Sequence, residues 1–166
     1  MHDLAAGHAR WVVGLLKNAS YDESVARRLQ LALAEFGQIA GSTAGDFGDV
    51  GLSQRCHITG LRAAHAAGDR GLAAHVVRGM AAQSMHRDQH REAVTLVDSA
   101  LAGGRGVHTV AQVAFLQSTK ARACAALGDM SASTASISAA RDAADRMHVG
   151  DFPPWLYWLT RDHIAA

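Results

Sequence analysis

The sequence is poor in several residue types, and each scarcity narrows the range of folds. Among its 166 residues are only 2 prolines and 2 cysteines, and aromatic residues make up 5%. Cys56 and Cys124 lie in separate segments without CxxC or zinc spacing, so neither a disulfide framework nor a structural zinc site has support. With so few aromatic residues, a β-sandwich or β-barrel is disfavoured.

An excess of one charge and long apolar runs are also missing. Sixteen Lys+Arg against fifteen Asp+Glu leave a net charge of +1, which gives no general attraction for a polyanion. The longest apolar run, Trp11 to Leu16, is far below the roughly 18 residues that span a bilayer, and the first ten residues lack a signal-peptide pattern. We therefore expect a reduced cytoplasmic protein that does not bind nucleic acid by this chain alone and has no membrane partner.

Alanine, by contrast, is abundant, at 34 of the 166 residues. Because alanine loses no rotamer freedom in a helix, the composition favours closely packed helices. Small residues recur every 40 positions, and small residues on facing helices let two backbones approach, as a repeating helix pair requires. The columns are Gly41, Ala81 and Ala121; Ala44, Ser84 and Cys124; Ser53, Ala93 and Ser133; and Gly60, Ala100 and Ala140, with turn positions at Gly48, Asp88 and Gly128.

This period predicts three helix pairs with an extra helix at each end, all in one all-α domain over residues 1–166. The predicted pairs are Ser24–Phe47 with Val50–Ala67, Arg70–His86 with His90–Ala102, and Thr109–Leu127 with Ser131–Met147. The extra helices are Asp3–Lys17 and a C-terminal capping helix over Pro153–Ala166, since proline suits a first helical turn.

Several segments carry a family resemblance. Ala126-Leu127-Gly128-Asp129 precedes a predicted turn and His65-Ala66-Ala67-Gly68-Asp69 lies between pairs, and with the 40-residue period they resemble tetratricopeptide repeats. More narrowly, the chain is similar to the C-terminal tetratricopeptide-like region of actinobacterial helix-turn-helix transcriptional regulators, in Gly7-His8-Ala9-Arg10, Arg91-Glu92-Ala93 and Pro153-Pro154-Trp155-Leu156-Tyr157-Trp158. Those regulators carry an N-terminal DNA-binding domain, and none is visible here. The chain is then either the regulatory domain alone or a stand-alone relative with another task.

The resemblance implies a concave groove lined by the first helix of each pair. Two arginines with aromatic residues nearby suit an acidic or aromatic small molecule or a peptide, because guanidinium groups grip carboxylates in bidentate fashion. The expected groove residues are Glu35, Gln38, Ser42, Asp46, His75, Arg78, Met85, His86, Phe115, Ser118, Arg122, Trp155 and Trp158. Arg141, on a second helix, is expected to lie outside this groove. Trp155 and Trp158 are equally consistent with simply sealing the last repeat.

For the residues that could carry catalysis or bind a metal, a structural role is the better explanation. Ala102-Gly103-Gly104-Arg105-Gly106 lacks the Lys-Ser/Thr of a phosphate loop, and no GxSxG or HExxH occurs. His57 replaces a mainly apolar column and reads as a buried, hydrogen-bonded imidazole. Cys124 reads as a packed thiol. His86 and His90 are separated by a predicted turn, which spoils a metal site. We expect no catalytic residue, no metal and no cofactor.

Three functions remain in view. The resemblance implies a non-catalytic sensor domain of a transcriptional regulator, which binds a peptide or small-molecule ligand. The first alternative is a stand-alone scaffold that binds a protein partner, a second copy of this chain included. The second is a small enzyme on a helical-repeat frame that uses His75, His86 and Glu35 or Asp46 as acid–base groups.

Overall fold

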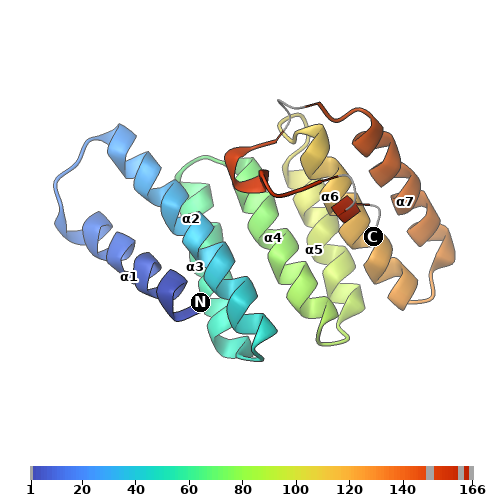
Figure 1. Cartoon of the computed structure of the whole chain (residues 1–166), viewed down its shortest axis with the longest axis horizontal. Coiled ribbons are helices and arrows are strands. Elements are labelled where there is room, and N and C mark those ends of the chain that lie inside the picture. Colours follow the sequence, from blue (N-terminus) through green and yellow to red (C-terminus); the bar gives the residue numbers. More distant parts are fainter. Residues whose placement is uncertain (1, 149–151, 161–162, 165–166) are drawn as a thin grey trace. The chain divides into compact units, whose positions relative to one another are not determined.

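The computed structural model describes residues 2–148, 152–160 and 163–164, and these form helices and no strand (Figure 1). The expectation of an all-α chain is confirmed. The elements are α1 (His2–Asn18), α2 (Glu23–Asp46), α3 (Val50–Ala66), α4 (Arg70–Met85), α5 (His90–Gly103), α6 (Val110–Ala126), α7 (Met130–Asp145) and the 3-10 turn η1 (Pro154–Leu156). The ends of α1 to α7 lie within two residues of the predicted ends.

Short polar side chains mark the first residues of several helices. The carboxylates of Asp22, Asp49 and Asp129 each accept a hydrogen bond from the backbone N–H three residues further on, at 2.8–2.9 Å. At the start of α6, Thr109 and Gln112 form a reciprocal capping box. These bonds satisfy N–H groups that have no partner within the helix, which is why the helices begin at these residues.

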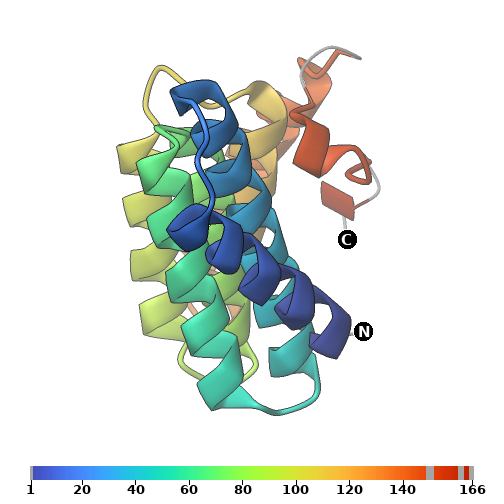
Figure 2. The same cartoon turned by 90° about the vertical axis from the view of Figure 1, so that its left-hand side faces the viewer.

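Packing divides the chain into two compact units, Met1–Met80 and Ala81–Ala166. In the first unit, α1 packs on α2 and α2 packs on α3 (Figure 2). The α2–α3 contact is a backbone contact, because a Cβ built on Gly37 would lie 2.8 Å from the Cα of Gly60 and 2.8 Å from the carbonyl oxygen of Cys56. Only glycine at position 37 permits this approach.

In the second unit, α6 packs on both α5 and α7. The faces of α6 and α7 are lined with alanine and are closed by apolar side chains from the C-terminal segment. The buried members of this core are Ala111, Ala114, Ala140, Ala143, Met147, Leu156, Leu159 and Ile164. The C-terminal segment is therefore part of the core of this unit.

The small residues of the 40-residue period are buried, and its turn positions share one backbone conformation. Gly48, Asp88 and Gly128 have φ of 81°, 59° and 76°, in the left-handed region. In each turn, the backbone N–H of the following residue donates to the carbonyl of the second small column, as in Asp49 N to Ala44 O at 2.9 Å. This is the Schellman ending of a helix, and it explains why glycine is favoured there.

The predicted capping helix over Pro153–Ala166 is wrong for the described part of that range. Helical geometry is limited to the 3-10 turn η1, the stretch 157–160 is not helical, and helix is assigned again only at 163–164; residues 161–162 and 165–166 lie outside the described residues. Residues with weak helix propensity occupy four of the six positions 155–160, namely Trp155, Tyr157, Trp158 and Thr160, and a short helix is marginal by itself. Burial of Leu156 and Leu159 against the core decides the path instead.

Asp88 is expected to be a point of weakness, because it holds a left-handed conformation that costs an L-residue more than glycine. The next residue, Gln89, makes no side-chain cap to α5, whereas Asp49 and Asp129 cap their helices. Changing Asp88-Gln89 to Gly-Asp should therefore raise the free energy of unfolding by about 1–2 kcal/mol in urea denaturation. The reciprocal change, Gly128→Asp, should lower it. Equal stabilities for all three chains would contradict this account of the turn.

Candidate ligand-binding site

Four of the expected groove residues form a polar group within the first unit. On α2, the amide Nε2 of Gln38 donates to Ser42 Oγ at 3.1 Å. On α4, His75 is buried and Arg78 is half-buried. The charge of Arg78 disfavours protonation of both His75 and His57, so these three side chains lie within electrostatic reach of one another. This group was not expected to include His57, which lies on α3.

His57 is a buried imidazole, as expected, with 1% of its surface exposed. Its Nδ1 lies 3.0 Å from the carbonyl oxygen of Ser53, which assigns the proton to Nδ1 and leaves Nε2 as an acceptor. A Cβ on Gly79 would lie 2.9 Å from that Nε2 and 2.5 Å from Gln38 Oε1. Within the described residues neither of these buried acceptor atoms has a hydrogen-bond partner.

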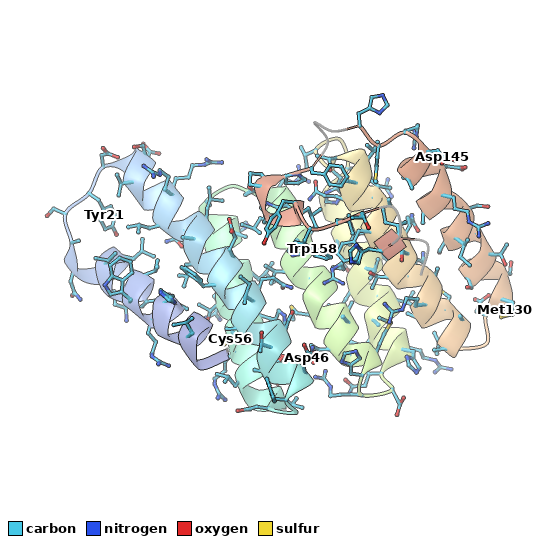
Figure 3. The ribbon with its side chains drawn as sticks, in the orientation of Figure 1. Tyr21, Asp46, Cys56, Met130, Asp145 and Trp158 are labelled. Atoms are coloured by element: carbon cyan, nitrogen blue, oxygen red, sulfur yellow. The ribbon has the colours of Figure 1, made fainter. Side chains whose placement is uncertain are left out.

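Burial controls the titration of this polar group. Burial, with Arg78 nearby, lowers the pKa of His57 to about 4 and that of His75 to about 3, so both are neutral at pH 7. Burial, with Asp69 nearby, raises the pKa of Glu35. Asp46 is exposed at the end of α2 (Figure 3). A neutral, buried His75 does not favour the enzyme alternative, which needs an accessible imidazole that exchanges protons near pH 7.

A cavity of about 390 Å³ lies between α6 and α7 in the second unit. Two expected site residues, Ser118 and Arg122, line it. The volume falls within the range of about 300–1,000 Å³ that is usual for small-molecule sites. Its other lining residues are mostly apolar: Ala121, Ala125, Ser133, Ile137, Ala140, Arg141, Ala144, Asp145 and Ile164.

Arg141, expected to lie outside the groove, lines the same cavity as Arg122, which was expected to lie in it. Both guanidinium groups are exposed, and neither makes a hydrogen bond or ion pair with any residue that the structure describes. Asp145 is a third charged group at this cavity, near the end of α7 (Figure 3). Sequence reasoning missed Arg141 and Asp145, although their spacing from Ile137 marks one face of a helix.

The aromatic site residues have a packing role. Phe115 and Trp155 pack against the α6–α7 core, and the ring of Trp158 meets that of Phe115 edge-on at 5.4 Å. The indole N–H of Trp158 donates to the carbonyl of Trp155 at 3.1 Å. A packing role against α6 and α7 is therefore supported for Trp155, whereas Trp158 keeps 38% of its surface exposed.

The remaining expected residues are Met85, half-buried at the end of α4, and His86, exposed just beyond it. Because α4 ends before His86 and α5 begins at His90, these two histidines do not share a helix, as the turn predicts. In the part of the chain that the structure describes, no three His, Cys, Asp or Glu residues are grouped as metal ligands. Six of the thirteen groove residues belong to the first unit and seven to the second, so one groove through all of them stays a prediction.

Comparison with known proteins adds no relative. No protein-family model, no curated protein and no solved structure matches the chain. Among the described helices, none has the length and apolar character that a membrane span requires. The case for a function therefore rests on the residues and on the geometry of the site.

Proposed function

We propose that this chain is a non-catalytic binding module, and that the cavity between α6 and α7 binds a small acidic, partly apolar molecule or an acidic peptide side chain. The observation that carries the proposal is the pair Arg122 and Arg141, which line one cavity without partners among the described residues. Two guanidinium groups beside apolar walls are suited to a carboxylate with a hydrocarbon body.

The balance of charge and surface in the cavity supports this ligand class. Two arginines and one aspartate, Asp145, leave one net positive charge among the residues that line the cavity. Ala140, Ala144, Ile137 and Ile164 offer the ligand apolar contact. Because salt screens exposed charges, the apolar contact is expected to contribute much of the affinity and the arginines most of the selectivity for anions.

We further propose that the helices form a tetratricopeptide-like array and that the module acts as the sensor of a transcriptional regulator. The array is supported by the buried small residues 40 positions apart and by the shared left-handed turns at Gly48, Asp88 and Gly128. The regulatory role is supported by the sequence resemblance alone. A DNA-binding segment joined to this chain in its gene is the feature that would support it independently.

Binding is expected to depend about equally on Arg122 and Arg141. A thermal-shift screen of small carboxylates and acidic peptides would select a ligand, and titration calorimetry would then compare variants. Replacing either arginine with alanine should weaken binding about tenfold, which corresponds to about 1.4 kcal/mol. Ala125→Leu, which fills part of the cavity, should also weaken it.

Arg91→Ala is the matched control, because Arg91 is an exposed arginine on α5 that does not line the cavity. It should bind as the parent chain does. Equal losses in Arg91→Ala, Arg122→Ala and Arg141→Ala would show that general charge, and not this cavity, holds the ligand.

A further inference from the structure

A second cavity, of about 270 Å³, lies in the first unit between α1, α2 and α3. No sequence motif pointed to it, and it shares no residue with the cavity between α6 and α7. Val13 of α1 and Leu52 and Thr59 of α3 form parts of its wall. Cys56, on α3, also lines it, and Figure 3 marks the position of this cysteine beside α1 and α2.

Two arginines reach this cavity from different helices, Arg10 from α1 and Arg55 from α3. Both charges act on the thiol of Cys56 and lower its pKa, although burial outweighs them and the pKa is raised overall. The geometric link between them is the cavity itself, of about 270 Å³, which both arginines line. For neither guanidinium group does the structure give a hydrogen-bond or ion-pair partner among the described residues.

One carboxylate, that of Asp49, lies within electrostatic reach of Cys56 but is absent from the cavity lining. Asp49 also acts on Cys56, but its carboxylate accepts the backbone N–H of Leu52 at 2.9 Å and begins α3. A Cβ on Gly51 would lie 3.3 Å from Nη1 of Arg55 and 3.8 Å from the carboxylate of Asp49, yet no ion pair joins the two side chains. The cavity therefore has an excess of positive charge above an apolar wall.

We propose that this cavity is a binding site for a small organic carboxylate, with the carboxylate between Arg10 and Arg55 and an apolar body against Val13 and Leu52. Its volume is below the range of about 300–1,000 Å³ that holds drug-sized molecules, so the apolar body is a single ring or a short chain. Bidentate contacts from two guanidinium groups select a carboxylate over its neutral amide. The proposal is independent of the function proposed for the second unit.

Cys56 provides a reporter at the site. Sodium benzoate and neutral benzamide, which have the same ring, would be tested for protection of Cys56 against the neutral reagent N-ethylmaleimide, with peptide mass spectrometry as the readout. Benzoate should slow modification of Cys56 in a saturable way, and benzamide should not. Arg10→Gln and Arg55→Gln should each raise the half-protecting benzoate concentration about tenfold.

Two internal controls make the result decisive. Arg62→Gln changes an exposed arginine of α3 outside the cavity and should leave protection unchanged. Cys124, which is buried in α6, reports any general change in stability or accessibility. The proposal is overturned if benzamide protects as well as benzoate, if benzoate gives no saturable protection, or if both cysteines are slowed equally.

Discussion

Replacing Gly37 with alanine is expected to lower the free energy of unfolding by about 3 kcal/mol, at the upper end of what overpacking usually costs. The new methyl group would lie 2.8–2.9 Å from backbone atoms of Cys56 and Gly60, and backbone atoms cannot rotate away as a side chain can. Relief requires α2 and α3 to separate. In a chain of this length such a loss lowers the melting temperature by roughly 6–12 °C in calorimetry.

Gly14→Ala is the matched control, because a Cβ on Gly14 of α1 meets nothing within 4 Å. The same substitution should there raise stability by up to about 1 kcal/mol, since alanine is the better helix former. Opposite signs at the two glycines are the expected result. A Gly37→Ala chain as stable as its parent would show that α2 and α3 are not in backbone contact.

Stability is expected to fall steeply as the pH decreases below about 6.5. The folded chain holds the pKa of His57 at about 4 and that of His75 at about 3, both below the ordinary value of 6.5. Well above pH 6.5 both histidines are neutral in the folded and in the unfolded chain, so their titration does not change the free energy of unfolding. Below pH 6.5 the two histidines are protonated in the unfolded chain but stay neutral in the folded chain. Lowering the pH therefore favours unfolding, until the pH reaches the pKa values of the histidines in the folded chain.

The size of this loss follows from the shift. A change of 2.5 pKa units at His57 corresponds to about 3 kcal/mol at 1.36 kcal/mol per unit. Urea denaturation between pH 6.5 and 5 should show an increasing uptake of protons on unfolding, approaching about two for the two histidines. The raised pKa of Glu35 acts in the opposite direction, because that carboxyl gains a proton first in the folded chain.

His57→Gln should reduce the slope of stability against pH, whatever it does to stability at pH 7. His65→Gln, at an exposed position on α3, should leave the slope unchanged. A parent chain whose stability is constant between pH 6.5 and 5 would show that the buried imidazoles are accessible to protons in the folded state.

Predictions from the sequence succeeded where the signal is local. Gly48, Asp88 and Gly128 were recognised as turns because the left-handed conformation favours glycine or aspartate whatever the rest of the chain does. His57 was expected to be buried because it occupies a column that is otherwise apolar. Neither prediction needs knowledge of which helix faces which.

Predictions differed from the structure where packing against a neighbouring element determines the conformation or the surroundings of a residue. The capping helix was inferred from Pro153-Pro154, but the segment after it follows the burial of Leu156 and Leu159. Arg141 was expected to lie outside the groove, yet it lines a cavity together with Arg122, an expected groove residue. The rotation of α7 against α6 sets that outcome, and helix rotation depends on how side chains interlock across the contact.

The sequence by itself determined that this chain is helical and where α1 to α7 begin and end, because alanine content, capping residues and left-handed turns act within a few residues of one another. Only the tertiary structure decided that Gln38 and His75 are buried and which arginines share a cavity. A contact such as that of Gly37 with Gly60 brings two helix backbones close together. How closely the helices approach, and not the polarity of a given side chain, then determines whether that side chain is buried.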